Sequence, residues 1–500
     1  MPVNTRHPEY VLASPRWQRC RDVYGGSDVV KARRTEYLPP LEGQKESDAA
    51  YLAYLARALF FPAMERTIGG LVGTALRKPP VILAPDSVAQ FLDDLTLVRD
   101  TFQAILIRVM QETLLLGRYG VLVDWSEKLA RPYWTLYAAE QVINWQQRRL
   151  ATTGEFLLTH LVLEERIPKD GRDSFSHEFA QQFREFELVE GVGVVVRLWQ
   201  QAPSPSQDLV IVEELVPKRK GAPLQAIPFV FFGPRSSVAE VTKPPLLDLA
   251  DLSLSHYRSA ADLEHGRHFT ALPTPWITGW AGDAAGNALS IGSGTAWVIP
   301  QEQAKVGMLE FTGQGLKALE TALESKERMM AVVGARLLEQ QPRQAETAEA
   351  VRLRQAGEQS VLATIVGSVS ASLTMALQWT AWWTGLEVLG DKSVECQLSR
   401  DFVEAKLNAQ EVTALVGLWQ ASAISYETLY WNLQQGEWAR PGVTWEEEKD
   451  EIDEEDALED ANAEPLEPVP PQPGERDAAM MPDELEESPD GENAIDDSEV

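Results

Sequence analysis

GQGLKALETALESKERMMAVVGARLLEQ, residues 313–340, places its apolar side chains at the i, i+3, i+4, i+7 spacing of one helix face. These apolar positions are Leu316, Leu319, Leu323, Met330 and Val333. Charged residues fall on the other faces, namely Lys317, Glu320, Glu324 and Arg328. The pattern predicts an amphipathic helix of about six turns.

A proline interrupts this helix, and a longer helix follows. Pro342 lacks a backbone donor and pushes Gln341 out of the α region. Helical sequence resumes at AETAEAVRLRQAGEQS (345–360) and continues through VLATIVGSVSASLTMALQWTAWWTG (361–385). At a rise of about 1.5 Å per residue the two helices would be roughly 30 Å and 60 Å long. Such lengths predict an elongated chain.

The second helix carries no charged residue from Gln359 to Leu386, which is long enough to cross a bilayer. The run nevertheless contains many hydroxyl and amide side chains, and neither end has the basic cluster that sets membrane orientation. A helix buried by protein is the preferred interpretation. A membrane-associated assembly protein that uses 359–386 as its span is the alternative.

The net charge of -30 is concentrated at the C-terminal end. Residues 445–500 hold 24 acidic side chains against Lys449 and Arg476, and the preceding 444 residues hold 51 acidic against 43 basic ones. A body near -8 argues against tight, sequence-independent binding of duplex DNA, which needs a basic surface. The Pro-rich acidic tail has too little apolar area to fold, apart from one helix near Trp445 to Leu458.

Cysteine usage and the N-terminus indicate a reducing compartment. Cys20 and Cys396 are too few for a disulfide scaffold and too far apart for a metal knuckle. The start MPVNTRHPEYVL lacks the charged and apolar segments of a signal peptide, so nothing marks the chain for export.

The order of elements predicts an α+β fold. Residues 1–45 look like an extended arm with short helical pieces around Pro15 to Tyr24. A helix begins at Ser47 and is kinked by Pro62, and another runs from about Leu97 to Leu116. The period then changes to two between Val121 and Phe232, which predicts an antiparallel meander. A helix after Pro244, a small β region, the helix at 313–340, the apolar helix and two short helices near 408–435 follow.

Motifs for enzyme chemistry are not found. The chain has no GxxxxGK[ST] phosphate loop and no GxSxG nucleophile elbow. His256, Glu264, His265 and His268 come closest to a metal constellation, but no fourth ligand accompanies them at a fixed spacing. A metal-dependent nuclease is therefore the third hypothesis, and we expect no enzyme activity, metal or cofactor.

Two polar or aromatic features remain. Trp379, Trp382 and Trp383 end the apolar helix and fit a core or a subunit contact better than a platform for stacking bases. Arg343 lies in a short loop of Gln, Arg and Glu between two long helices, where it is either an ordinary surface residue or a ligand-facing one.

Three motifs in this order resemble portal proteins of tailed bacteriophages and prophages. They are GVLVDW (120–125) after a helix, MMAVVGARLLEQ (329–340), and ETAEAVRL (346–353) at the start of the next helix. The resemblance covers Tyr51 to Pro441. It implies a structural ring, usually a dodecamer, at one capsid vertex, through which double-stranded DNA is packaged and ejected. Implied partners are the large terminase, adaptor or neck proteins, and major capsid and scaffold proteins, in the virion and in the host cytoplasm during assembly.

The resemblance also implies a division of the chain into named parts. They are an N-terminal arm (1–46), a wing of helices and β meander (47–243), a first stem helix (244–268), a clip (269–312), a second stem helix (313–337), a tunnel loop (338–346), a long helix (347–390), crown-like helices (391–444) and the acidic tail (445–500).

Particular residues follow from this division. The tunnel loop facing DNA would be Glu339, Gln340, Gln341, Pro342, Arg343 and Gln344. The clip docking surface would be Pro275, Trp276, Trp280 and Trp297. The stem helices would contact neighbouring subunits through Leu249, Leu252, Tyr257, Leu319, Leu323 and Met330.

Overall fold

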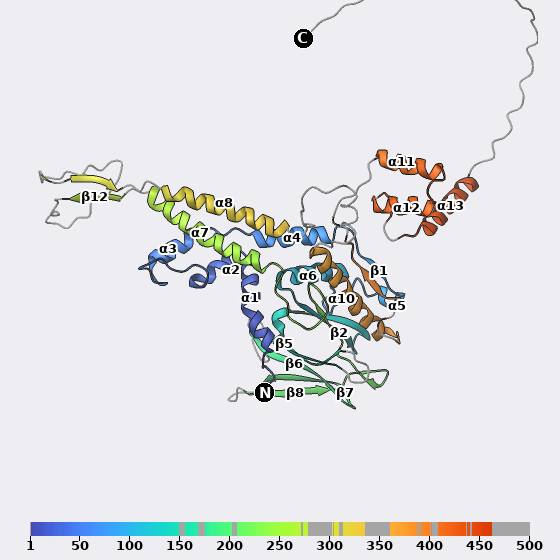
Figure 1. The fold of residues 1–500 in the computed structure, drawn as a ribbon. Helices are drawn as coiled ribbons and strands as arrows, with labels where there is room; N and C mark the ends of the chain where they lie inside the picture. Colours follow the sequence, from blue (N-terminus) through green and yellow to red (C-terminus); the bar gives the residue numbers. More distant parts are fainter. Residues whose placement is uncertain are drawn as a thin grey trace, which may run out of the picture. The chain divides into compact units, whose positions relative to one another are not determined.

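The computed structural model divides the chain into two compact units, residues 1–404 and residues 405–500 (Figure 1). The structure describes residues 2–149, 156–168, 175, 177–202, 208–271, 274–278, 303, 305–309, 314–335, 361–387, 390, 392–400, 402, 409–436, 438–440 and 443–462. Within these residues the fold mixes helices with antiparallel sheets, as the α+β prediction requires.

The helices of the first unit are α1 (Pro8–Tyr24), α2 (Ser27–Ala32), η1 (Arg34–Glu36), α3 (Ala49–Arg57), α4 (Ala63–Ala75), α5 (Asp86–Ala89), α6 (Phe102–Leu116), η2 (Ala139–Gln141), α7 (Leu247–Ala271), α8 (Gln314–Ala335) and α10 (Val361–Thr384). Its strands are β1 (Val81–Leu83), β2 (Tyr119–Ser126), β3 (Arg131–Ala138), β4 (Val142–Arg149), β5 (Phe156–Pro168), β6 (Phe179–Val189), β7 (Gly193–Gln201), β8 (Leu209–Leu215), β9 (Lys218–Arg219), β10 (Ala222–Pro223), β11 (Phe229–Phe232), β12 (Thr274–Thr278), β13 (Lys305–Leu309) and β14 (Glu395–Gln397).

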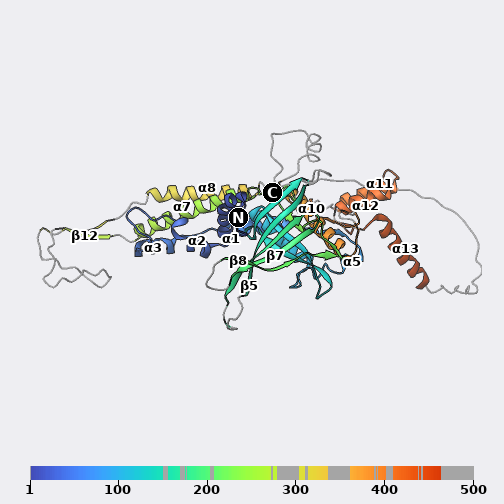
Figure 2. The ribbon, with the colours of Figure 1, turned by 90° about the horizontal axis from the view of Figure 1, so that it is seen from below.

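The predicted meander forms two main sheets. β4 to β8 pair in sequence order as a five-stranded antiparallel sheet, whose strands lie side by side in Figure 2. β2 and β3 instead pair with the late strand β11 in a separate three-stranded sheet. Alternation along single strands predicted the antiparallel pairing, but it carries no information on which distant strand closes a sheet.

Helix α10 occupies the core of the first unit. Leu362, Ile365, Val366, Leu373 and Leu377 are each at most 1% exposed. The helix contacts both β2 and β3 and also α5 and α6. Its end is fixed by side-chain hydrogen bonds, because Trp134 Nε1 donates to Thr380 Oγ1 at 2.8 Å and Trp383 Nε1 donates to the Val123 carbonyl at 3.1 Å.

Helix α6 shows how local signals set element ends. Thr101 caps its N-terminus by accepting from the Ala104 backbone N–H at 3.3 Å. Gly117 ends it at φ 71°, a left-handed conformation that side chains rarely adopt. The chain turns there directly into β2, as the sequence GRYGVLVDW predicts.

The N-terminal segment corrects the prediction of an extended arm. Helix α1 begins about two turns earlier than the pieces expected near Pro15, and Trp17, Cys20 and Val23 lie buried at helical spacing in the main core. Pro8 stands at the first helical position, where a missing N–H costs nothing. The many Pro, Gly and charged residues of this segment favoured the prediction of an extended arm, although the segment contains a short row of buried side chains.

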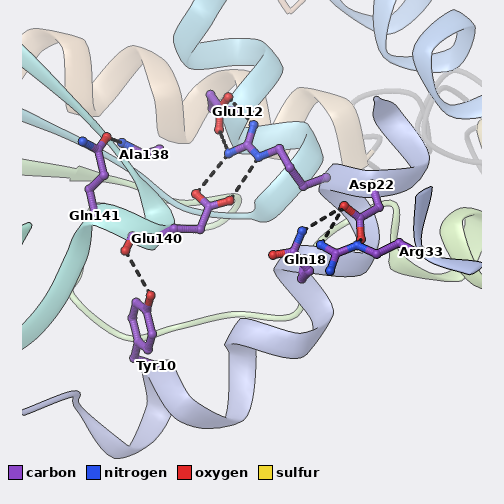
Figure 3. A network of polar contacts seen from close by, with 9 residues as sticks. Tyr10, Gln18, Asp22, Arg33, Glu112, Ala138, Glu140 and Gln141 are labelled. Carbon is purple, nitrogen blue, oxygen red and sulfur yellow. Dashed lines mark hydrogen bonds and ion pairs between the residues drawn. The ribbon is translucent and has the colours of Figure 1, made fainter. Parts of the chain in front are cut away.

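Polar contacts fasten α1 to the body of the first unit (Figure 3). Arg21 donates to both Glu112 oxygens, at 2.7 and 2.9 Å, and to Glu140 at 3.0 Å. The buried Asp22 carboxylate accepts from the Tyr37 hydroxyl at 2.7 Å and pairs with Arg33 at 2.8 Å. Because each charge has a partner, the segment belongs to the fold rather than to a free arm.

Pro62 has a stronger effect than the predicted kink. Helix α3 ends at Arg57 and α4 begins at Ala63, so the proline separates two helices.

The second unit contains α11 (Ala409–Gln420), α12 (Tyr426–Gln435) and α13 (Trp445–Asn462). α11 and α12 match the two predicted short helices, and α13 extends the one helix predicted in the acidic tail. The Tyr426 ring contacts the rings of Trp419 and Trp445 at centroid distances of 5.7 and 6.1 Å. Residues 463–500 lie outside the described residues.

Candidate functional site: the α7–α8 helical hairpin

Helices α7 and α8 lie side by side and antiparallel, with strands β12 and β13 in the sequence between them (Figure 1). A small apolar cluster joins them, formed by Ala260, Leu263 and Leu323, with Leu316 and Leu319 packed against it. These positions recur at helical spacing on both helices, which is why the sequence pattern located the helices correctly.

Polar side chains flank this cluster along the hairpin. Lys326 Nζ donates to the Ser255 carbonyl at 2.9 Å and to Ser259 Oγ at 2.7 Å. Arg267 bridges Glu264 on its own helix and Glu320 on α8, at 2.7 and 2.8 Å. Burial lowers the pKa of Lys326, and the neighbouring Arg258 lowers it further. The pair is thus held by specific contacts as well as by apolar area.

His256 lies at this interface with 7% of its side chain exposed. Its Nε2 atom is 3.2 Å from Glu327 Oε1 on α8, and the Phe61 ring lies 5.8 Å away. Burial lowers the pKa of His256; the Glu327 carboxylate opposes this effect and Lys326 adds to it.

The opposite side of α7 is fixed to the N-terminal helices. Asp262 accepts from the Tyr54 hydroxyl at 2.6 Å, and Arg258 Nε donates to the Tyr37 carbonyl at 2.9 Å. Asp251 pairs with Arg19 at 2.5 Å. Helix α7 is therefore held from two sides.

The six residues predicted as stem contacts between subunits face the interior of this one chain. Leu249 and Tyr257 are fully buried, Met330 is 2% exposed and Leu323 is 9% exposed, while Leu252 and Leu319 are half-buried. The apolar helix faces that were predicted to contact a neighbouring subunit pack mainly against other parts of the same chain. Subunit contact through the stem helices stays a prediction.

The exposed face of α8 carries both apolar and charged side chains. Met329 and Val332 are each 46% exposed, three residues apart on the helix. Arg328 pairs with Glu324 one turn away at 3.3 Å. A mixed, exposed helix face of this kind is typical of the rim of a protein interface.

Strands β12 and β13 form an antiparallel pair with exposed apolar side chains. Trp276 pairs with Gly307 and is 41% exposed, and a side chain at Gly307 would meet its ring at 2.6 Å. Val306 and Met308 are 52% and 53% exposed. Pro275 of β12 is paired with Met308 of β13. Trp280 and Trp297 lie outside the described residues.

The predicted tunnel loop, Glu339, Gln340, Gln341, Pro342, Arg343 and Gln344, also lies outside the described residues, as does the helical sequence 345–360. Helix α10 follows this segment. It is long and apolar enough to cross a membrane, yet 61% of the relevant window is buried inside the protein.

Several hydroxyl groups of α10 donate hydrogen bonds to neighbouring elements. Ser368 Oγ donates to the Gly233 carbonyl at 2.8 Å, and Ser370 Oγ donates to the Cys396 carbonyl at 2.6 Å. Trp379 and Trp383 are 8% exposed and belong to the core. The described part of α10 therefore has the environment of a soluble core helix, which argues against the membrane alternative.

The histidines of the nuclease hypothesis have different neighbours. His256 faces Glu327, His265 contacts the rings of Tyr54 and Phe269, and His268 Nε2 lies 3.1 Å from Arg57 Nη2. Within the part of the chain that the structure describes, no group of three or more His, Cys, Asp or Glu side chains could hold a metal ion.

Some residues of the hairpin were not found from the sequence. Lys326 and Arg258 bind backbone carbonyls of another element, and Val306 and Met308 are exposed on a short strand. For Lys326, the sequence contained one indication of a contact with the other helix, namely a lysine at a position of the apolar helix face. For Arg258 it contained none, because the contact depends on the position of Tyr37, more than 200 residues away.

Comparison with known proteins gives a family match over this part of the chain. A family model described as a domain of unknown function, DUF4055, matches residues 245–384, which run from the start of α7 to the end of α10. No curated protein matches the sequence.

Solved structures that match this chain include chains from particles of a gene transfer agent (GTA). A chain from the neck of the empty GTA particle, computed with C6 symmetry, has a TM-score of 0.38 at 12% identity and is matched over 79% of this chain and 95% of its own. A chain from the neck of the native particle, computed with C12 symmetry, gives 0.35 at 13% identity, over 75% and 89%. A chain from the native virion gives 0.35 at 12% identity, over 81% and 98%. At these scores no residue role is taken from them.

Proposed function

We propose that this protein is a portal protein, a structural component that assembles as a ring, usually of twelve copies, at one vertex of a phage-type capsid. The observation that carries the proposal is the α7–β12–β13–α8 hairpin followed by the buried helix α10. The same order carries the motifs MMAVVGARLLEQ and ETAEAVRL, by which the sequence resembles portal proteins.

The contacts of the hairpin fit a ring of identical subunits. Helix α7 is held on one side by the N-terminal helices and on the other by α8, whereas α8 exposes Met329 and Val332. A head-to-tail ring joins two different surfaces of each copy, so one subunit can expose an apolar face that another covers. In this proposal α7 and α8 are the stem, and residues 47–243 form the wing.

The charge distribution fits a channel through which DNA slides. A body near -8 lacks the basic surface that binds phosphates tightly, so the duplex would pass with little resistance. Residues Glu339 to Gln344 are proposed as the loop that faces DNA, with Arg343 as its clear positive charge. We infer that these loops contact the duplex without sequence preference and shift as it passes.

Strands β12 and β13 are proposed as part of a docking surface for the packaging motor and, later, for neck proteins. Trp276, Val306 and Met308 expose apolar area on a two-stranded pair, which gains stability when another protein covers it. Such a role is structural and requires no catalytic residue.

The test is the mass and shape of the purified protein, measured by native mass spectrometry and negative-stain class averages. We expect rings of about twelve copies with a central hole. A protein that stays monomeric at high concentration and in the presence of its scaffold protein would contradict the proposal. A species that dissolves only in detergent would favour the membrane alternative.

A second test addresses DNA. Arg343→Glu should leave ring formation intact and reduce packaging or DNA retention, with Arg343→Lys as the control that keeps the charge. Equal DNA content in both variants would remove Arg343 from the proposed loop function.

A further inference from the structure

Within the described residues, the two edges of the five-stranded sheet differ in character. At one edge lies β8, the last strand in the order β4-β5-β6-β7-β8. Its residues 210–215 are all exposed, and they include Val210, Ile211, Val212 and Leu215 at 39% to 51% exposure. Edge strands are commonly shielded by proline, lysine or a covering segment, and LVIVEEL contains neither residue.

The other edge is β4, and half of it is covered. His7 donates its backbone N–H to the Ile143 carbonyl at 2.9 Å, and Asn144 Nδ2 donates to the Thr5 carbonyl at 2.9 Å. The N-terminal segment thus occupies the first half of the strand. Residues 146–149, with the sequence QQRR, are exposed, and Phe156 beside them on β5 is 69% exposed.

The two edges carry opposite charges. Arg148 and Arg149 stand at the end of β4, and Glu213 and Glu214 stand near the end of β8, where Glu214 also pairs with Arg197 of β7 at 2.7 Å. Consecutive strand residues point to opposite faces, so each face of the sheet carries a base at one edge and an acid at the other. A second copy of this chain offers both edges in this arrangement.

We propose that β8 of one copy pairs with residues 146–149 of β4 in the next copy, so that the sheets join into a continuous belt around the ring. The inference rests on the proposed ring and names one of its subunit contacts. β4 and β8 run in the same direction, because four antiparallel pairings separate them. Copies related by rotation would therefore meet through parallel strands.

The apolar side chains support the same contact. Adding a strand to β8 gives Val210, Ile211, Val212 and Leu215 neighbours on both faces of the sheet, and Phe156 lies beside the proposed partner strand. Backbone hydrogen bonds would supply affinity, and the charges would set the direction of the ring.

The size of the sheet sets the diameter that such a belt would have. Five strands at about 4.8 Å spacing span about 24 Å, so twelve copies would close a belt roughly 290 Å around and about 90 Å across. Density for the wing sheets at a diameter far from this value would contradict edge-to-edge pairing.

Charge exchange tests the contact directly. Arg148→Glu with Arg149→Glu should raise the concentration needed for half-maximal ring assembly by roughly tenfold, because four acids then face one another. Glu213→Arg with Glu214→Arg should do the same. The variant that combines all four substitutions should recover assembly, since the charges are again complementary. Failure of the combined variant to recover, with both partial variants folded, would overturn the proposal.

The controls separate this contact from the ring itself. Lys128→Glu and Glu127→Arg alter exposed charges in the β2–β3 turn and should leave assembly unchanged. If the unmodified protein forms rings and the edge variants assemble normally, this contact is wrong and the portal proposal stands. If the unmodified protein forms no ring even at high concentration and with its scaffold protein, the portal proposal itself fails.

Hydrogen exchange gives a measurement without substitutions. Amides of residues 210–215 and 146–149 should be protected in the ring and exchange at least tenfold faster in the monomer. Equal exchange in both states would show that the edges stay open, or that they serve a different protein.

Discussion

Helices α8 and α10 are nearly the same length, 22 and 24 residues, and they lie in entirely different surroundings. α10 is enclosed by strands and helices of its own unit, with Leu373 and Leu377 fully buried. α8 packs on α7 through one stripe and leaves Met329 and Val332 exposed. Helix α10 is a core element, and helix α8 has one face exposed at the surface.

The difference shows where the stability of the chain comes from. Most apolar side chains of α10 belong to the main hydrophobic cluster, whereas α8 contributes Met330 to that cluster and Leu323 to a separate small cluster with Ala260 and Leu263. A helix that keeps an apolar stripe exposed has free energy available for association. Substitutions should therefore affect folding in α10 and association in α8.

The largest effect is expected for Leu373→Ala in α10. Removing a fully buried leucine side chain leaves a cavity and should cost about 3 to 5 kcal/mol. Because the chain has two units, local stability is best measured by native-state hydrogen exchange of α10. Met375→Ala, at a position 40% exposed on the same helix, is the matched control and should cost less than about 1 kcal/mol.

A smaller effect is expected for Leu323→Ala in α8. This side chain is 9% exposed in a small cluster, so its truncation should cost about 2 kcal/mol or less. Amides of α7 and α8 should exchange faster while those of α10 do not change. A loss as large as that of Leu373→Ala would mean that Leu323 is not confined to a separate small cluster.

Acidification should weaken the hairpin through His256. Its folded pKa is lowered, mainly by burial, so the unfolded chain takes up the proton first and stability is lost as pH falls below about 6.5. Glu327 and Lys326 face this ring from α8, and Phe61 contacts it. The change should be smaller than that of either alanine substitution.

The test compares hydrogen exchange of α7 and α8 at pH 7.5 and pH 5.5, after correction for the intrinsic rate. His256→Gln should remove part of the pH dependence. His265 on α7 also has a lowered pKa, mainly through burial, and should account for some of the remainder. Identical pH dependence with and without His256 would place the titrating group elsewhere.

The comparison also explains what the sequence could predict. Periodicity located α7, α8 and α10, and alternation located the strands of the meander, because these patterns depend on local geometry. Neither pattern indicates which element or subunit covers an apolar helix face. Leu249, Tyr257 and Met330 were predicted to contact another subunit, and they pack inside this chain.

The other differences have the same physical origin. The pairing of β11 with β2 joins strands about 100 residues apart, and the burial of Trp17 depends on contacts with distant elements. Neither leaves a local signal. The exposure of Val306 and Met308 could likewise not be predicted, since a strand pattern does not distinguish an open face from a covered one.

The smallest effect on folding, and the most informative for assembly, is expected for Met329→Glu with Val332→Glu. Both positions are 46% exposed, so the free energy of unfolding of the hairpin should change by about 0.5 kcal/mol or less. If this face meets a neighbouring subunit, two buried carboxylates there should prevent ring formation. Met329→Leu with Val332→Ile keeps the apolar character and should assemble normally. Rings that form with both glutamates in place would mean that the open face of α8 borders solvent or the channel, and subunit contacts would have to lie on other surfaces.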